Sequence, residues 1–511
     1  MKRRIAFILA LALLVIFTVT ACAKKEDDDD GDNEWELSTE GGRKSEPDDL
    51  PDDINLKGYK FTVFYRQGDG IKLYECDGDD VESEGVNAIY ESVYLRNERV
   101  KARLKCDIKW IPSTSGGLSE TKTEIGQILR RMEYYDLILS TNNTQIALGE
   151  NSMLCELSST PYLDFSKPWW WEDVMRELSF NGEDIHFLVG DMNLVNITKM
   201  SAFYFNFKLV EQYLRMTPED MYNMVDEKKW TIEKLRTLSN NLWIDTGANP
   251  NEIGKKDQGD IFAFPYVSGE TVNQFVYSTR IADQLYTRRE NGLVNFDWRG
   301  NQDMEDVVTE LRKLIHNTGG AWNRSPKSGQ ASPYDSGIIK EFSEGHYVFL
   351  PQRLTAATTA YMMAMEDDYG IIPYPTLTAG DDYYSYIQDS STSMCVPLVV
   401  RVTSEDNLDR VSMMLEAICA ESYRYVTETF YEAALKGRYA RDDNAARMID
   451  LIYNTAHKSF ICEYSSVAKG IAGRFYTAIW ADKALAGYLD EEMDGAKNTL
   501  NAWIADLIKK Q

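Results

Sequence analysis

The positions of apolar residues along the chain repeat with two periods, one typical of β-strands and the other of α-helices. The first part of the folded chain reads strand, helix, strand, helix, strand, over residues 58–70, 87–104, 106–113, 119–134 and 135–143. The helical period is clear in the second segment, where Ile89, Val93 and Val100 share one face. This order predicts parallel strands joined by helical crossovers, with the carboxyl ends of the strands at one edge of the sheet.

The second half of the chain continues in the same style. Strands are expected within 201–213, 259–282, 344–356 and 369–375, and helices within 217–242, 303–317, 409–437 and most of the C-terminal tail. Thr217 is a suitable N-cap, Pro218 suits the first helical position, and acidic residues follow in the first turn. The whole pattern predicts an α/β protein, and about 460 residues are too many for one core, so two domains are expected.

The start of the chain has the layout of a signal peptide. Three basic residues precede an uncharged apolar run, 5–19, which is too short to span a bilayer comfortably. Thr20, Ala21 and Cys22 follow the run, and VTAC (19–22) resembles a bacterial lipobox, in which the cysteine is lipidated and becomes the new N-terminus. Residues 1–21 are therefore expected to be a signal peptide. Cys22 is expected to carry the acyl chains of a membrane anchor. The alternative is an ordinary signal peptide with a chance cysteine.

A strongly acidic segment follows the cysteine. Residues 26–53 contain fourteen acidic residues against Arg43 and Lys44, and almost no apolar residue apart from Trp35. A segment of this composition cannot bury enough apolar surface to offset its ordering entropy, and its charges repel one another. Residues 22–53 are therefore expected to be a disordered tether between the anchor and a folded body that begins at residue 54.

Charge and cysteine usage exclude several kinds of site. The formal net charge is −26; the first 25 residues carry +5 and residues 26–53 carry −12, which leaves −19 for the folded body. Nucleic acid and anionic lipid surfaces are therefore excluded as partners. The six cysteines after Cys22 show no C-x-x-C spacing, and the four histidines are scattered, so no metal site and no cofactor are expected. Buried thiols are expected, with one disulfide left open.

Aromatic content is high, with 30 tyrosines and 11 tryptophans. These side chains present a broad apolar face with a polar tip, which suits sugars, although most of them are expected to fill the cores. Trp169, Trp170 and Trp171 could form a stacking platform, but a packed cluster is the favoured interpretation. Trp322 and Tyr334 lie in or beside a Gly/Ser/Pro-rich segment that could reach a ligand.

The order of several segments resembles a known family. The segment 167–213 contains KPWWWEDV, an Asn-Gly turn and YFNFKLV, and the later segments TIEKLRTLSNNL, EFSEGHYVFLP and YGIIPYP follow in the same order. In this order the chain resembles the extracellular solute-binding proteins of ABC transporters, in the carbohydrate-binding group that includes maltose-binding protein. The likeness covers nearly all of residues 54–511, and it rests on the ordered set rather than on one motif.

The resemblance implies two hinged lobes with a ligand between them. Lobe one is expected at 54–192 plus about 391–436, and lobe two at 193–388 plus about 437–511. The implied function is that of a monomeric, membrane-anchored binding protein outside the cell. It would capture an oligosaccharide or another small solute and deliver it to the subunits of an ABC permease, without catalysis.

Candidate ligand-binding residues follow the predicted strands or lie at the crossover between lobes, since strand ends point to the ligand in open α/β sheets. They are Tyr65, Gln67, Asn142, Asp191, Asn193, Asn196, Ser268, Glu270, Gln352 and Arg353, with Trp322 as an additional candidate. Amide and carboxylate groups can bind neighbouring hydroxyls through paired contacts.

Two other functions stay open. The chain lacks the G-x-S-x-G, H-E-x-x-H, G-x-x-x-x-G-K-[ST] and G-x-G-x-x-G motifs. A lipid-anchored glycoside hydrolase remains an alternative, because 81 acidic residues offer many carboxylate pairs. A structural or adhesive surface lipoprotein is the other.

Overall fold

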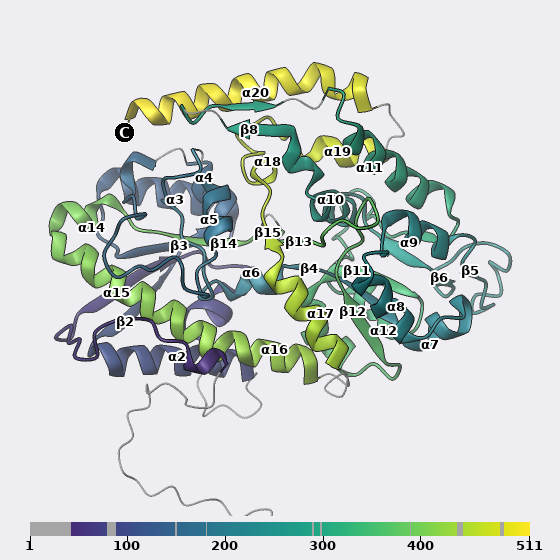
Figure 1. Ribbon diagram of the computed structural model, residues 1–511, viewed down its shortest axis with the longest axis horizontal. Coiled ribbons are helices and arrows are strands. Elements are labelled where there is room, and N and C mark those ends of the chain that lie inside the picture. Colours follow the sequence, from purple (N-terminus) through teal and green to yellow (C-terminus); the bar gives the residue numbers. More distant parts are fainter. Residues whose placement is uncertain are drawn as a thin grey trace, which may run out of the picture.

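The computed structural model places the helices and strands in two lobes that lie side by side (Figure 1). It describes residues 42–78, 88–148, 151–179, 181–288, 291–296, 299–388, 390–436, 443–480 and 485–510. The expected signal peptide, Cys22 and the tether up to residue 41 lie outside the described residues. Among the described helices, none combines the length and the apolar character needed to cross a membrane.

The first lobe is built on a four-stranded sheet in the order β14-β3-β1-β2. Its strands are β1 (Lys60–Tyr65), β2 (Asp107–Pro112), β3 (Leu137–Thr141) and β14 (Thr392–Cys395). β1 runs parallel to β2 and β3, as the alternating pattern predicts, whereas β14 returns from the second lobe and pairs antiparallel with β3. The carboxyl ends of the three parallel strands therefore meet the start of β14 at one edge.

The first sheet carries its helices on both faces. They are α2 (Ala88–Leu104), α3 (Leu118–Arg131), α4 (Asn142–Ile146), α5 (Glu172–Leu178), α14 (Leu398–Thr403), α15 (Glu405–Glu421) and α16 (Thr427–Lys436). Short turns of helix complete this lobe, namely η2 (Arg43–Ser45), η3 (Lys72–Cys76), η4 (Asn151–Met153) and η9 (Ser422–Val426). The long helices α15 and α16 pack against α2.

The sheet of the second lobe differs from the prediction of parallel strands. β4 (Ser201–Asn206) lies between β11 (Phe349–Arg353) and β12 (Tyr369–Ile372) and is antiparallel to both. The reason is topological, because β4 enters this lobe from the crossover while β11 and β12 return toward it. Two small ribbons adjoin it, the parallel pair β7 (Phe264–Tyr266) and β10 (Ala321–Asn323) and the antiparallel pair β5 (Trp243–Ile244) and β6 (Ile261–Phe262).

Helices surround the second sheet. They are α7 (Phe207–Leu209), α8 (Pro218–Asp226), α9 (Ile232–Ser239), α10 (Ser268–Ser278), α11 (Gln302–Arg312), α12 (Gly337–Ser343), α13 (Ala360–Met363), α17 (Asp443–Asn454) and α19 (Ala472–Trp480), with short turns η5 (Val210–Leu214), η6 (Ile281–Leu285), η7 (Lys313–Asn317) and η8 (Leu354–Thr358). The segment 217–242, expected to be helical, forms two helices. Thr217 caps α8 in a capping box with Asp220, and Thr231 begins α9 with a new cap.

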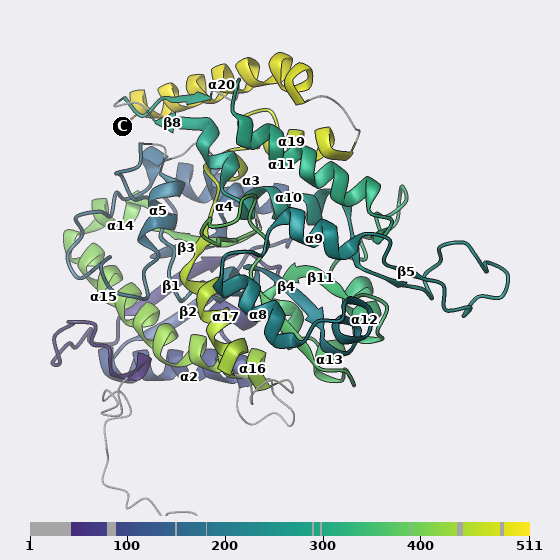
Figure 2. The same ribbon diagram turned by 45° about the vertical axis from the view of Figure 1, so that its right-hand side comes forward.

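Several elements lie at the junction of the lobes. They are α6 (Leu194–Thr198), β13 (Ser385–Tyr386), β15 (Ala456–His457), α18 (Phe460–Glu463), the hairpin β8 (Tyr286–Arg288) and β9 (Val294–Phe296), and α20 (Leu485–Lys510). Figures 1 and 2 show α20 running along one edge of the molecule above both lobes. α18 contacts α4 and α5 of the first lobe and η6 of the second.

The packed chain begins before residue 54, which corrects the expected extent of the tether. Leu50 is buried, and the Asp48 carboxylate accepts hydrogen bonds from Arg103 at 2.8 Å and from Arg424 at 3.2 Å. These cations come from α2 and η9. The acidic composition of this stretch is therefore offset by basic residues that lie far away in the sequence.

The tryptophan cluster is packed into the first lobe, as the favoured interpretation predicted. Trp169 and Trp170 are buried, and their indole N–H groups donate to the two carboxylate oxygens of Glu416 at 3.1 and 2.8 Å. Burial raises the pKa of Glu416 to about 8. The six cysteines after Cys22 are free thiols, five of them buried, so the structure contains no disulfide among them.

Replacing Glu416 with alanine should destabilise the first lobe, because two buried indole donors lose their acceptor. Each unsatisfied buried donor costs about 1–3 kcal/mol. We expect Glu416→Ala to lower the free energy of unfolding by about 2–4 kcal/mol in urea titrations. Glu416→Gln keeps an acceptor and should lose less. Equal stability of the alanine variant and the wild type would contradict this role.

Candidate functional site

The two segments that cross between the lobes are joined by buried amides. The Asn196 amide donates to the Thr392 carbonyl at 2.9 Å, and the Thr392 N–H donates to the Asn196 side-chain oxygen at 2.6 Å. Asn193 donates to the Thr392 hydroxyl at 3.2 Å. Both asparagines have no exposed surface. These two candidate ligand residues therefore connect the crossing segments in this structure.

Three other candidates are also buried at the junction. Asp191 accepts hydrogen bonds from Trp171 at 2.9 Å, Tyr453 at 2.7 Å and Thr427 at 2.7 Å. Asn142 donates to the Ser391 hydroxyl at 3.2 Å, and Tyr65 is 4% exposed at the end of β1. These side chains lie at the carboxyl edge of the first sheet, as expected, but they point into the packed interior.

A chain of polar contacts runs across the junction from one lobe to the other. On the first-lobe side, Lys199 donates to the Ser390 carbonyl at 2.9 Å and lies 3.7 Å from the Asp69 carboxylate. The backbone N–H of Gln388 donates to the Lys199 carbonyl at 3.3 Å. The side chain of Gln388 accepts from Arg353 at 2.6 Å. We call these residues, together with Asp335, the junction network.

Arg353 ends β11 and carries the second-lobe half of this network. Its guanidinium forms an ion pair with Asp335 and lies 5.2 Å from the centre of the Tyr334 ring. Gln352, also buried, donates to the Tyr334 carbonyl and accepts from the Arg353 N–H. Tyr334 of the Gly/Ser/Pro-rich segment and the last two residues of β11, Gln352 and Arg353, are thus brought together.

The network presents its carboxylates to solvent and buries its cations. The Asp335 side chain is 75% exposed and that of Asp69 is 33% exposed, whereas those of Lys199 and Arg353 are 8–9% exposed. Burial acts to raise the pKa of Asp69, but Lys199 and Arg66 outweigh it and lower the pKa below its ordinary value. Asp69 is therefore a charged hydrogen-bond acceptor at neutral pH, oriented by Lys199 and Arg66, and the buried Arg353 guanidinium orients Asp335.

The remaining candidates lie in three separate places. Ser268 and Glu270 form the first turn of α10 and are half-buried, and the Ser268 N–H donates to the Ser325 hydroxyl. Gln67, which is exposed after β1, donates to the Ser113 carbonyl of its own lobe. Trp322 stacks on the Phe262 ring at 4.5 Å and 12°, so it packs on the β6 strand. The structure does not bring Trp322 to the junction network.

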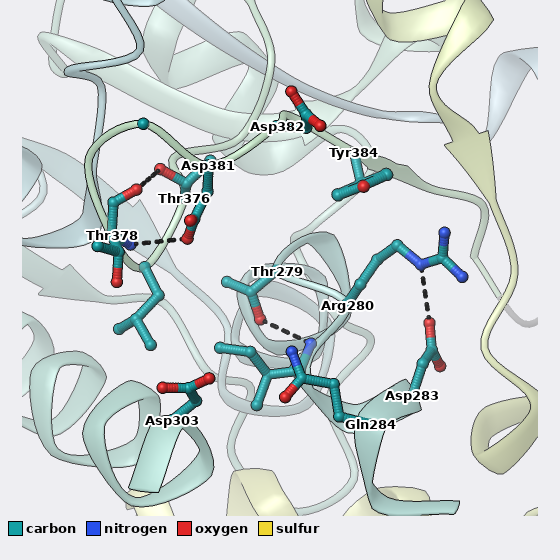
Figure 3. A pocket seen from close by; sticks show the side chains of 13 residues that line it. Thr279, Arg280, Asp283, Gln284, Asp303, Thr376, Thr378, Asp381, Asp382 and Tyr384 are labelled. Atoms are coloured by element: carbon teal, nitrogen blue, oxygen red, sulfur yellow. Dashed lines mark hydrogen bonds and ion pairs between the residues drawn. The ribbon is translucent and has the colours of Figure 1, made fainter. Parts of the chain in front are cut away.

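Three cavities lined by described residues lie elsewhere along the junction. One cavity, of about 660 Å³, is lined by Arg280, Asp283 and Tyr384, among others from 279–284, Asp303 and 376–384 (Figure 3). The Arg280 guanidinium donates to Asp283 at 3.3 Å and lies 5.1 Å from the centre of the Tyr384 ring. No candidate ligand residue lines this cavity. It combines three separate segments, and no sequence pattern marks them as neighbours.

Two smaller cavities continue from this one. The second, about 360 Å³, shares Arg280 and Tyr384 with the first and is also lined by Asp173 and Glu177 of α5. The third, about 350 Å³, includes Trp170 and Trp171. These three cavities follow the junction from the second lobe to the first. Within the described ranges, no group of three or more His, Cys, Asp or Glu side chains could hold a metal ion.

A buried carboxyl group connects both crossing segments. Glu75 has no exposed surface, and one of its oxygens accepts from the Val195 N–H at 3.0 Å and from the Thr392 hydroxyl at 2.6 Å. Burial raises the pKa of Glu75 to about 8, although Thr392, Val195, Lys199 and Arg96 each act to lower it. The folded protein therefore holds this proton more tightly than the unfolded chain does.

Stability should fall with rising pH because of Glu75. Its contribution is fully present below the ordinary pKa of 4.5 and is lost as the pH rises toward the folded pKa of about 8. The slope is at most about 1.4 kcal/mol per pH unit. We expect Glu75→Gln to flatten the decline of unfolding free energy between pH 5 and 8, measured in urea. Glu252→Gln, at a side chain that is 41% exposed, is the control, and equal slopes in both variants would contradict the assignment.

Comparison with known proteins identifies the fold. No family model matches the chain, and no curated protein sequence matches it. Among solved structures, the maltose-binding protein MalE of Listeria monocytogenes in complex with maltose is 16% identical, with a TM-score of 0.51 over 87% of this chain and 98% of that chain. The GacH receptor of Streptomyces glaucescens, solved with and without acarbose, is 12% identical, with a TM-score of 0.51 over 88% and 99%.

A third structure has the same architecture. UgpB of Mycobacterium tuberculosis in complex with glycerophosphocholine is 12% identical, with a TM-score of 0.51 over 87% of this chain and 99% of that chain. The sequence identities are low, so these likenesses describe the fold. They confirm the prediction of an α/β protein with two lobes. The chain has the two-lobed fold of the solute-binding proteins that it resembles in the order of its segments.

Proposed function

We propose that this protein is the substrate-binding component of an ABC importer, which captures a carbohydrate between its lobes and delivers it to a membrane permease. The observation that carries the proposal is the junction network, in which exposed Asp69 and Asp335 are oriented by buried Lys199 and Arg353. Charged oxygen acceptors held beside cationic donors suit the hydroxyl groups of a sugar. Closure of two lobes on such a ligand would exclude water from these contacts.

The solved structures with this fold support the class of ligand. These proteins were solved in complex with maltose, acarbose and glycerophosphocholine, all of which carry hydroxyl groups. We take an oligosaccharide as the ligand class for this chain. Ser268 and Glu270 at the start of α10, and Gln67 after β1, are the other half-buried or exposed candidates for contacts from the two lobes. Binding needs no cofactor.

Binding is favoured over glycoside hydrolysis by the placement of the carboxyl groups. Hydrolysis needs a proton-donating carboxyl group with a raised pKa beside the substrate. Burial raises the pKa of Glu75 and Glu416 to about 8, but both groups are packed against internal donors. Burial also raises the pKa of Asp283 to about 7, and this side chain is 10% exposed and pairs with Arg280. The exposed Asp69 has a lowered pKa.

The N-terminal sequence supports an extracytoplasmic, membrane-anchored location. The basic start, the apolar run and VTAC at residues 19–22 fit a lipoprotein signal, with Cys22 as the lipidated residue. We propose that acyl chains on this cysteine hold the protein at the outer face of the cell membrane. The permease in the same membrane would then be its partner.

A ligand panel read by thermal denaturation tests the binding function. A sugar present at 100 times its dissociation constant should stabilise the protein by about 2.7 kcal/mol. Arg353→Ala should weaken binding of that sugar about 10- to 100-fold, because a charged hydrogen bond contributes about 1.5–3 kcal/mol. Lys208→Ala, which removes an exposed cation of the second lobe, is the control. Release of new reducing ends from the bound sugar would support the hydrolase instead.

Metabolic labelling with an alkyne fatty acid tests the anchor. The wild-type protein expressed in a lipoprotein-processing bacterium should carry the label and sediment with membranes. Cys22→Ala should lose both properties, because the thiol that accepts the lipid is absent. Cys106→Ala serves as the control for loss of a cysteine in the folded body. Label retained by Cys22→Ala would exclude this anchor.

A further inference from the structure

Arg43 sits in a cage of three tyrosine rings. Its guanidinium carbon lies 4.6 Å from the centre of the Tyr423 ring and 5.0 Å from the centres of the Tyr431 and Tyr453 rings. The rings of Tyr431 and Tyr453 themselves meet edge to face, at 5.6 Å and 75°. We call Tyr423, Tyr431 and Tyr453 the tyrosine cage. A guanidinium is attracted to the faces of aromatic rings, and several rings around one cation add their contributions.

The tyrosine cage is assembled from elements on both sides of the junction. Tyr423 belongs to η9 and Tyr431 to α16, and both of these elements pack against α2 of the first lobe. Tyr453 belongs to the last turn of α17, which packs against β12 of the second lobe. The cage is therefore complete only while α17 lies beside α16, so its geometry depends on how the lobes are placed.

Two acidic side chains, Asp191 and Glu428, lie next to the tyrosine cage. The Tyr453 hydroxyl donates to the buried Asp191 carboxylate at 2.7 Å, and the Thr427 hydroxyl of α16 donates to the other oxygen of the same group at 2.7 Å. Glu428 lies 3.8 Å from the Arg43 guanidinium. The cage thus offers a cation both aromatic faces and nearby negative charge, and the Arg43 side chain is 19% exposed there.

The chain that follows Arg43 is fastened to the first lobe. Arg424 donates twice to the Glu46 carbonyl, at 3.0 and 2.6 Å, and Lys167 forms an ion pair with Asp49 at 2.6 Å. Asp48 is held by Arg103 and Arg424, as described above. The end of the acidic segment is therefore a fixed part of the first lobe, from which Arg43 reaches Tyr453 on α17.

We propose that Arg43 locks the lobe junction, with its guanidinium holding α17 against α16 in the arrangement described here. The acidic segment is then not only a spacer, because its last residues stabilise one relative position of the two lobes. A rotation that carries α17 away must withdraw Tyr453 from the guanidinium. The lock requires neither a lipid nor a sugar. An experiment that excludes the lock would therefore leave the proposed sugar-binding function intact.

Hydrogen–deuterium exchange of the full-length, ligand-free protein tests this lock. Arg43→Ala should raise exchange in 443–454 at least severalfold, and Arg43→Lys, which keeps a cation, should give an intermediate value. Lys44→Ala is the matched control, since the Lys44 ammonium lies over Tyr425, outside the cage. Tyr453→Leu, which removes one ring, should raise exchange in 43–45.

The comparison of segments separates a lock from simple fraying. Loss of Arg43 from a merely docked terminus would raise exchange in 43–50 and leave α17 unchanged, and that result would overturn the proposal. Small-angle X-ray scattering gives a second readout, because a released junction should change the radius of gyration in Arg43→Ala and not in Lys44→Ala. Identical scattering of both variants, with unchanged exchange in α17, would exclude the lock.

Discussion

The arrangement of the two lobes depends on the buried pairing of the segments that cross between them. Asn196 binds the backbone of Thr392 through both ends of its amide, and Glu75 joins Val195 to the same threonine. Unpaired buried polar groups are costly, so each crossing segment fixes the register of the other. β4 and β14 begin within a few residues of these contacts. The positions of both sheets therefore follow from this pairing.

The same constraint explains why polar residues at strand ends serve two purposes here. Asp191, Asn193 and Asn196 are at the edge where open α/β sheets bind ligands, yet they have no exposed surface and bind other parts of the chain. The side chains that do face solvent are Asp69, in the loop between β1 and η3, and Asp335, in the loop before α12. At this edge, the residues nearest the strands connect the lobes, and the next ones are available to a ligand.

Local sequence patterns predicted most helices and strands but not their long-range partners. Period-two and helical spacing placed β1, α2, β2, α3 and β3, and the Thr217 cap placed α8. No local signal showed that β4 would be antiparallel to its neighbours, or that Glu416 would bind tryptophans 246 and 247 residues away. The acidic composition predicted disorder through residue 53, but the last residues of this segment are packed. Composition cannot reveal that Arg424 pairs with Asp48 across 376 residues.

Docking at Arg43 also bears on the proposed anchor, because it sets the length of chain between Cys22 and the folded body. Twenty residues separate these two positions, instead of the 31 that would separate the cysteine from a body starting at residue 54. Twenty residues reach at most about 70 Å when fully extended. The effective concentration of a tethered protein near a partner falls with roughly the −3/2 power of linker length, so the shorter span raises it about twofold. Encounters with a partner in the same membrane would become more frequent in proportion.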